Sequence, residues 1–120
     1  MSKSSWKRKI KDATEAAGTY RSYFDSIIDI LADIMDKRDQ AQQKYVESGE
    51  NPTITYENAG GAVNTVKNPA LVLIMDLNTQ ALAYWRDLGL TPSGLKKINA
   101  EQLENKPKSG FVELLGKFSA

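Results

Sequence analysis

Apolar residues recur at helical spacing along most of this chain. Between residues 21 and 48 they follow one another at alternating intervals of three and four, and the stretch contains neither Gly nor Pro. This spacing is typical of a helix that packs along a second helix. Gly49 and Pro52 come next, and both residue types end helices. The pattern predicts the longest helix of the chain over residues 21–48.

A later stretch, residues 68–88, is apolar over an unusually wide arc. Asn68 and Pro69 begin it, because an Asn side chain caps free amides and Pro is preset for the first helical turn. The apolar side chains fill an arc of about 200°, roughly twice what one buried face requires. We therefore expect this helix to contact two surfaces. One is the helix over residues 21–48, packed as an antiparallel hairpin. The other could be a first helix near the N-terminus, but the narrow apolar stripe of that helix makes a neighbouring copy of the chain the better candidate.

The wide arc supplies the residues that we expect at an interface between copies. Asn78 is the polar residue inside it and has two interpretations of equal weight. A buried amide can fix the register between copies, or the side chain can form a hydrogen bond within its own chain. The residues assigned to the interface are Leu73, Leu77, Asn78, Ala81, Tyr84 and Trp85.

Between these two helices the chain predicts a β-hairpin. Residues 53–57 and 62–66 flank a four-residue turn that contains two glycines. A lone two-stranded ribbon is marginally stable, so we expect the hairpin to need support from another element or chain. The expected register places on one face Ile54, Tyr56, Val63 and Thr65.

Shorter helices are expected at both ends. The apolar stripe of residues 4–17 is narrow, so this helix should lie on another element, and Gly18 can end it. Thr91 and Pro92 begin a short helix that continues through Ile98. The expected fold is mainly α: a long antiparallel helical hairpin with a β-hairpin insertion. We divide it into a basic N-terminal helix (1–18), a helical core and oligomerisation domain (19–100, with the β-hairpin at 53–66) and a flexible tail (101–120).

Composition excludes several kinds of chemistry. The chain contains no Cys and no His, which removes thiolate nucleophiles, imidazole catalysis and the usual zinc sites. The glycines at 60–61 lack the spacing of a phosphate-binding loop. No apolar run is long enough to cross a bilayer, and no secretory signal is visible. We expect a cytoplasmic protein that is not an enzyme and has no catalytic residue, no metal site and no cofactor.

A row of aspartates on the longest helix resembles a metal or acid-base cluster. Such a row is more often a solvated helix face, and Asp33 with Lys37 forms an ordinary pair one turn apart. We therefore expect these carboxylates to repel DNA from the outer surface of the helix. The row consists of Asp25, Asp29, Asp33 and Asp36.

The net charge of +1 conceals an uneven distribution along the chain. Residues 1–11 carry five basic side chains and no acidic one, whereas residues 12–95 carry twelve acidic and six basic ones. In a single copy, a basic start of this kind is usually only a solvated helix end. Repeated around an assembly, the same cations would form a large positive surface.

Several motifs, in this order and at these spacings, resemble one family of phage terminase small subunits. They are the basic opening Trp6-Lys7-Arg8-Lys9, the turn Gly60-Gly61, the helix start Lys67-Asn68-Pro69-Ala70 and the junction Leu88-Gly89-Leu90-Thr91-Pro92-Ser93. The likeness covers most of residues 6–98. It departs from the family at Ser93-Gly94-Leu95, where many relatives carry a small residue followed by Arg.

The resemblance implies a non-catalytic subunit that assembles as a ring of several copies in the infected bacterial host cell. It implies two further partners, double-stranded viral DNA and the large terminase subunit, which carries ATPase and nuclease activities. In such an assembly we expect the basic ends to contact DNA phosphates, with no base-reading motif present. The candidates are Lys3, Lys7, Arg8, Lys9 and Lys11, followed by Lys96 and Lys97, which can also stabilise a helix C-terminus.

The last residues carry a short amphipathic pattern after a linker that contains Pro and Gly. Their spacing predicts a helix that either binds the large subunit or folds back on the core, and the linker favours the partner. These residues are Phe111, Leu114, Leu115 and Phe118. Two other functions remain open. One is a small dimeric helical DNA-binding regulator of phage or prophage origin, and the other, a carboxylate hydrolase, has no support in the sequence.

Overall fold

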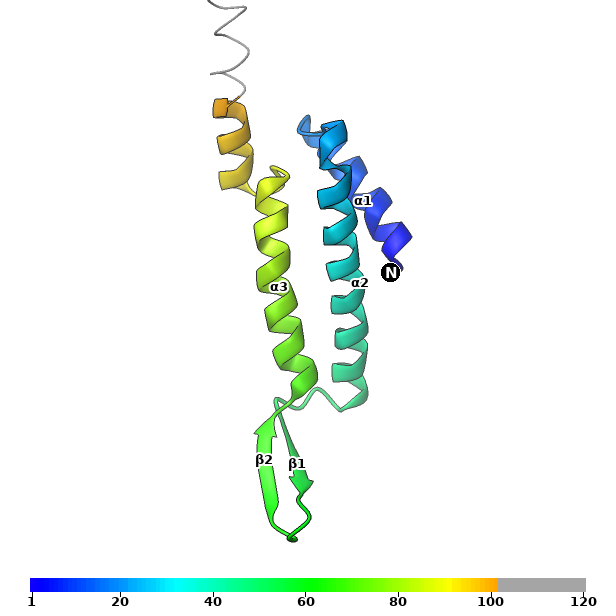
Figure 1. Cartoon of the computed structure of the whole chain (residues 1–120), viewed down its shortest axis with the longest axis vertical. Helices are drawn as coiled ribbons and strands as arrows, with labels where there is room; N and C mark the ends of the chain where they lie inside the picture. Colours follow the sequence, from blue (N-terminus) through cyan, green and yellow to red (C-terminus); the bar gives the residue numbers. More distant parts are fainter. Residues whose placement is uncertain (102–120) are drawn as a thin grey trace, which may run out of the picture.

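The computed structural model describes residues 1–101 and contains three main helices and one β-hairpin (Figure 1). A short 3-10 turn, Ser22–Phe24, precedes α2, and a further helical stretch at 92–101 follows α3. The molecule is therefore mainly α, as predicted. The elements are α1 (Lys3–Ala17), α2 (Asp25–Glu47), β1 (Thr53–Glu57), β2 (Val63–Lys67) and α3 (Pro69–Asp87).

The predicted helix ends are confirmed to within a few residues, and local chemistry explains them. Asn68 accepts a hydrogen bond from the Ala70 amide at 3.0 Å, with Pro69 in the first turn of α3. Ser2, two residues before the predicted start of this helix, caps α1 by accepting a hydrogen bond from the Ser5 amide at 3.2 Å. The backbone at Gly18 is left-handed, with φ of 75°, which ends α1 without the steric cost that a side chain would add.

The core lies along the seam between α2 and α3, which run antiparallel as predicted (Figure 1). Leu31, Ile34 and Ala41 of α2 are buried, and so are Leu77 and Ala81 of α3. Their spacing of three and four within each helix keeps these side chains on one stripe. The seam thus extends over most of both helices.

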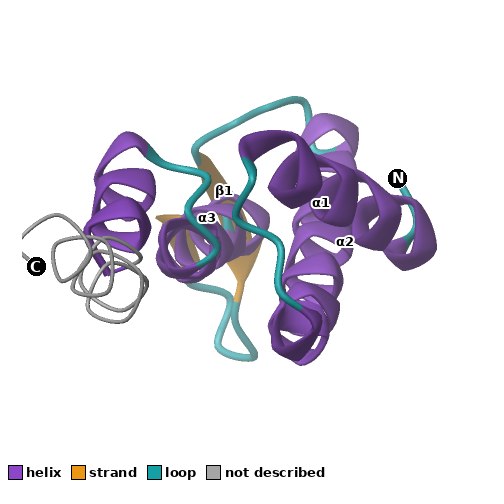
Figure 2. Ribbon diagram, turned by 90° about the horizontal axis from the view of Figure 1, so that it is seen from above, coloured by secondary structure: helices purple, strands orange, loops and turns teal. Residues whose placement is uncertain are grey.

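α1 packs on the other side of α2, so that α2 lies between α1 and α3 (Figure 2). Ile10 and Thr14 of α1 are completely buried, although both belong to a helix with few apolar residues. The prediction that this helix lies on another element is confirmed. Among residues 1–101, no helix is long and apolar enough to cross a membrane.

The β-hairpin projects beyond the helices at the end opposite the short helix (Figure 1), and its register differs from the prediction. Ile54 pairs with Val66 and Tyr56 with Asn64, so Val63 lies on the opposite face from Tyr56. The turn has five residues instead of four, because the Asn58 side chain accepts hydrogen bonds from the amides of residues 60 and 62, both at 3.0 Å. One extra residue in the turn shifts the pairing of β2 by one position, so each side chain of β2 lies on the opposite face from the one predicted.

The junction between α3 and the helical stretch 92–101 requires a residue without a side chain. Gly94 lies so close to α3 that a Cβ atom there would stand 2.1 Å from the carbonyl oxygen of Arg86. Its amide donates to the Thr91 hydroxyl at 3.0 Å, which confirms Thr91 as the cap of the predicted short helix. A side chain at position 94 would therefore collide with the backbone of α3.

Candidate nucleic-acid and assembly surfaces

α1 is held on α2 by polar contacts as well as by its buried side chains. The Trp6 indole nitrogen donates a hydrogen bond to Asp39 at 2.6 Å. Lys3 and Lys7, one turn apart, both reach Asp29, with N–O distances of 3.3 and 3.5 Å. The helix therefore has a fixed orientation, with two of its cations turned towards the acidic row of α2.

The five predicted N-terminal cations divide into two groups. Lys3 and Lys7 are partly neutralised by Asp29. Among residues 1–101, no carboxylate lies within 4.0 Å of Arg8, Lys9 or Lys11, all of which are exposed. We call these three residues the free cation group. They are the part of α1 whose charge is most available to a phosphate.

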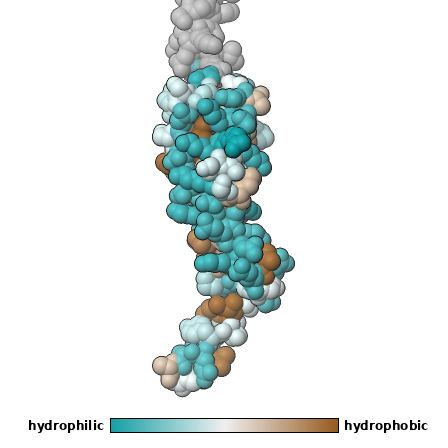
Figure 3. All heavy atoms as spheres, turned by 90° about the vertical axis from the view of Figure 1, so that its right-hand side faces the viewer, coloured by the Kyte–Doolittle hydropathy of each residue, from teal (hydrophilic) through white to brown (hydrophobic). Residues whose placement is uncertain are grey.

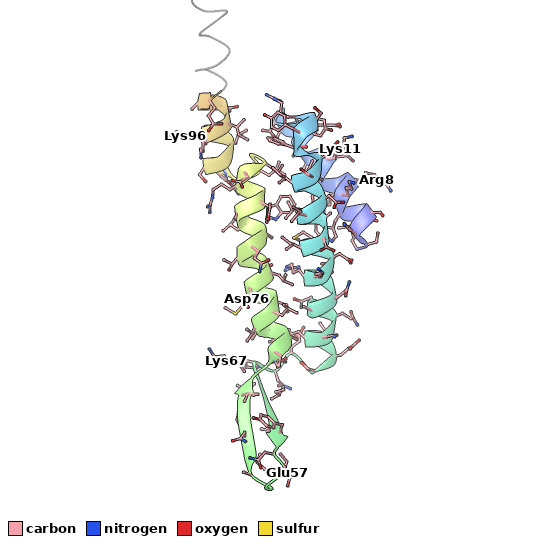
Figure 4. The ribbon with its side chains drawn as sticks, viewed as in Figure 1. Arg8, Lys11, Glu57, Lys67, Asp76 and Lys96 are labelled. Carbon is pink, nitrogen blue, oxygen red and sulfur yellow. The ribbon has the colours of Figure 1, made fainter. Side chains whose placement is uncertain are left out.

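Aromatic rings support two members of the free cation group. The Lys9 ammonium lies 5.0 Å from the centre of the Trp6 ring, and the Lys11 ammonium lies 5.1 Å from that of Tyr20. A cation over an aromatic face keeps its charge while losing some conformational freedom. Arg8 extends from α1 into solvent (Figure 4), and the surface formed by α1 and α2 is mostly hydrophilic (Figure 3).

Lys96 and Lys97 lie on the exposed surface of the helical stretch 92–101. This stretch is at the same end of the molecule as Lys11, but on the other side of the helical hairpin (Figure 4). The structure therefore does not bring these two lysines into one patch with the free cation group. Lys96 and Lys97 therefore form a separate basic surface.

The acidic row of α2 is occupied by ion pairs and hydrogen bonds. Asp33 pairs with Lys37 at 2.9 Å, as the sequence predicts, and Asp25 accepts from the Tyr20 hydroxyl at 2.8 Å. Within residues 1–101, no group of three or more acidic side chains is arranged to hold a metal ion. Asp29 is the member of the row that pairs with α1, through Lys3 and Lys7.

The residues predicted at the interface between copies take three different positions. Leu77 and Ala81 face α2 and are buried within the chain, so the hairpin already covers most of their surface. Tyr84 and Trp85 are half-buried and pack against the same core. Leu73 is 48% exposed and remains a candidate. The sequence shows the width of the apolar arc, but it does not show which part of that arc faces α2.

Asn78 is exposed and belongs to a contact within its own chain. Its side-chain oxygen accepts a hydrogen bond from the Arg38 Nε atom at 2.6 Å, which links α3 to α2. This contact agrees with the second of the two interpretations of Asn78. The amide oxygen of Asn78 thus has a hydrogen-bond donor within its own chain and does not need one from a second copy.

α3 keeps an apolar surface that no part of residues 1–101 covers. Val72 is 38% exposed, Met75 61% and Leu82 49%. These three residues, with Asp76, define the outer face of α3. α1 does not cover it because α1 packs on α2. We expected this helix to have more apolar surface than the helical hairpin buries, and the exposure of these residues confirms it. Most of the exposed apolar residues, however, are not among those predicted at the interface.

The contacts of α1 predict an acid-sensitive stability. Hydrogen bonds from Lys3 and, less strongly, Lys7 lower the pKa of Asp29 below its ordinary value of 3.8. Burial alone would raise the pKa of Asp39, but hydrogen bonds from the N-terminal ammonium and Trp6 outweigh it and lower that pKa. A depressed pKa stabilises the fold fully above the ordinary value, and this contribution is lost as the pH falls through the folded-state pKa.

We therefore expect wild type to lose more unfolding free energy between pH 7 and about pH 3 than the double variant Asp29→Asn/Asp39→Asn, which starts lower at pH 7. Urea unfolding followed by tryptophan fluorescence at both pH values measures this difference. Asp12→Asn, an exposed change on α1, serves as the control and should keep the wild-type pH dependence. Equal losses in wild type and the double variant would contradict the account.

The predicted large-subunit contacts, Phe111, Leu114, Leu115 and Phe118, lie outside the described residues. A family model described as phage terminase, small subunit, matches residues 2–105 of the chain. This match spans every element from α1 to the helical stretch after α3. It confirms the resemblance drawn from the basic opening, the Asn-Pro helix start and the Gly-Leu-Thr-Pro junction. No curated protein and no solved structure matches the chain.

Proposed function

This chain belongs to the phage terminase small-subunit family, and from that membership we propose that it is a non-catalytic adaptor for viral genome packaging. In this role it binds double-stranded phage DNA and presents it to the large subunit, which carries the ATPase and nuclease activities. The cellular setting is the cytoplasm of the infected bacterium.

The observation that carries the DNA-binding part is the free cation group on a firmly docked helix. Arg8, Lys9 and Lys11 are exposed without a neighbouring carboxylate in the described chain, while Ile10 between them is completely buried. A rigid helix presents its cations at fixed spacing. Each contact with a phosphate then releases condensed counterions, which favours binding without any contact to bases.

Assembly of several copies supports the same role. A single α1 offers few cations, but a ring of copies places many of them around one DNA duplex. The exposed apolar outer face of α3 supports such an assembly, because a contiguous apolar surface on a small chain is usually covered by a partner. We propose that residues 19–100 form the oligomerisation domain and that residues 1–18 supply the main DNA contacts.

The large-subunit contact is proposed from the sequence alone. Residues 111–118 place their apolar side chains at helical spacing after a linker that contains Pro and Gly. An amphipathic helix of this kind fits an apolar groove on a partner protein. This segment would connect the adaptor to the motor without involving the helical core.

The test of the DNA-binding role is an affinity series with the wild-type chain and a double-stranded fragment at several salt concentrations. Fluorescence anisotropy is expected to show log K falling linearly and steeply with log salt, because phosphate contacts dominate. Similar affinities for unrelated sequences of the same length are expected as well. No detectable binding at low salt would contradict the proposed function.

A further inference from the structure

Two different surfaces of the helical hairpin have no partner within residues 1–101. One is a groove of about 160 Å³ between α2 and α3. Its floor is apolar and includes the exposed Leu73, whereas its α2 side carries two lysines and a glutamine. The residues that line the groove are Lys37, Gln40, Ala41, Lys44, Leu73 and Leu77.

The cations of the groove differ in how far they are already neutralised. Lys37 pairs with Asp33 at 2.9 Å, whereas no carboxylate of the described chain lies within 4.0 Å of Lys44. Lys44 is exposed. The groove therefore offers an apolar floor beside one free positive charge.

The second surface is the outer face of α3, which has the opposite character. It presents Val72, Met75 and Leu82 to solvent, together with the carboxylate of Asp76. Figure 4 shows Asp76 on the side of α3 that faces away from α2. Asp76 has no ion pair within residues 1–101. The carboxylate of Asp76 beside the apolar patch thus complements the ammonium of Lys44 beside the groove.

The two surfaces also lie at the same height along the hairpin. Arg38 contacts Asn78 across the seam at 2.6 Å. Because α2 and α3 are antiparallel with equal rise per residue, residue 76 is level with about residue 40. Asp76 therefore lies at a height between Lys37 and Lys44, which are one turn above and one turn below that level.

We propose that the outer face of α3 in one copy docks into the α2–α3 groove of a second copy, with Asp76 beside Lys44 of that neighbour. This inference rests on the proposed assembly and specifies which surfaces meet. Because the two surfaces are different, a copy that uses one of them in a contact keeps the other free, and the contact can repeat from copy to copy. A head-to-tail contact of this kind closes into a ring where the rotation between successive copies divides a full turn, and it extends as an open filament where it does not.

Chemistry favours a second copy over DNA as the occupant of both surfaces. The outer face of α3 is apolar and carries a carboxylate, which phosphates repel. The groove has an apolar floor that a phosphate backbone would leave unfilled. Both surfaces, by contrast, would bury apolar area against each other and pair two charges at the edge of the contact.

Charge reversal provides the test. Asp76→Lys and Lys44→Glu are each expected to raise at least tenfold the concentration at which the full-length chain assembles, measured by sedimentation velocity. Mixed in equal amounts, the two variants are expected to assemble again, because Lys at 76 of one faces Glu at 44 of the other. Asp12→Lys, an exposed reversal of the same size on α1, is the control and should assemble like wild type.

The outcomes separate this inference from the assembly proposal itself. If wild type forms a multi-subunit species and Asp76→Lys assembles equally well, the proposed contact is wrong while the ring remains. If the two variants fail to assemble when mixed, the pairing of Asp76 with Lys44 is also wrong. A wild-type species of only two copies overturns the head-to-tail arrangement. A wild-type chain that stays monomeric at all concentrations overturns the assembly proposal.

Discussion

Replacing Arg8, Lys9 and Lys11 together by Ala is expected to weaken binding to double-stranded DNA by roughly a hundredfold at about 0.15 M salt. Each phosphate contact contributes about 0.9 to the slope of log K against log salt, so the slope should become shallower by up to about 3 for each bound copy. Fluorescence anisotropy across a salt series measures both quantities. Circular dichroism should show an unchanged helix content, since all three side chains are exposed.

The matched control is the double variant Lys3→Ala/Lys7→Ala. These two lysines lie on the same helix, but they already pair with Asp29 at 3.3 and 3.5 Å. Each removed charge should therefore weaken DNA binding less than a charge removed from the free cation group. If the double variant loses as much affinity per charge as the triple variant, the division of the N-terminal cations is wrong. If the triple variant binds like wild type, α1 does not contact DNA.

Replacing Ile10 by Ala is expected to destabilise the chain by about 2–4 kcal/mol, because the deleted side chain leaves a cavity in a fully packed site. Ile10 has no exposed surface, and it joins α1 to the core formed by α2 and α3. The measurement is urea unfolding followed by circular dichroism at one fixed protein concentration, since assembly makes apparent stability depend on concentration. Weaker DNA binding is expected to accompany the loss, because a loosened helix no longer fixes its cations.

Val63→Ala is the control for this experiment. It also shortens a branched apolar side chain, but Val63 is 70% exposed at the end of the β-hairpin. A change below about 0.5 kcal/mol is expected there. Equal effects at Ile10 and Val63 would show that α1 is not packed on α2 as described.

The contacts of α1 explain how a basic helix can pack against an acidic one and still present free positive charges to DNA. The cations nearest α2, Lys3 and Lys7, pair with Asp29. This pairing reduces the repulsion between Asp29 and the other aspartates of α2. The cations further round the helix keep their charge. One short helix thus supplies both its own attachment and a positive surface.

Local sequence chemistry predicted the helices well. Asn68 with Pro69, the alternating apolar spacing of α2 and the glycine after α1 act over a few residues, so they can be recognised in the sequence. The resemblance to the terminase small subunits rests on the same local features. These include the Thr91 cap, whose hydroxyl accepts the Gly94 amide in the structure.

Longer-range geometry could not be predicted in the same way. The Asn58 side chain adds a residue to the hairpin turn, and this single change exchanges the strand faces. The pairing of Lys3 with Asp29 depends on the angle at which α1 crosses α2, and the spacing of residues along the sequence does not determine that angle. Likewise, Leu77 and Leu82 both belong to the apolar arc of α3, but only the packed hairpin shows that the first is buried and the second exposed.

In the proposed assembly, several copies of this chain contact one another through α3 and bring the cations of α1 together. Native mass spectrometry of the full-length chain without DNA tests it most directly. The account predicts one dominant species whose mass is a whole multiple, greater than two, of the 13.3 kDa chain mass. A spectrum that contains only the 13.3 kDa species at every concentration tried would contradict it.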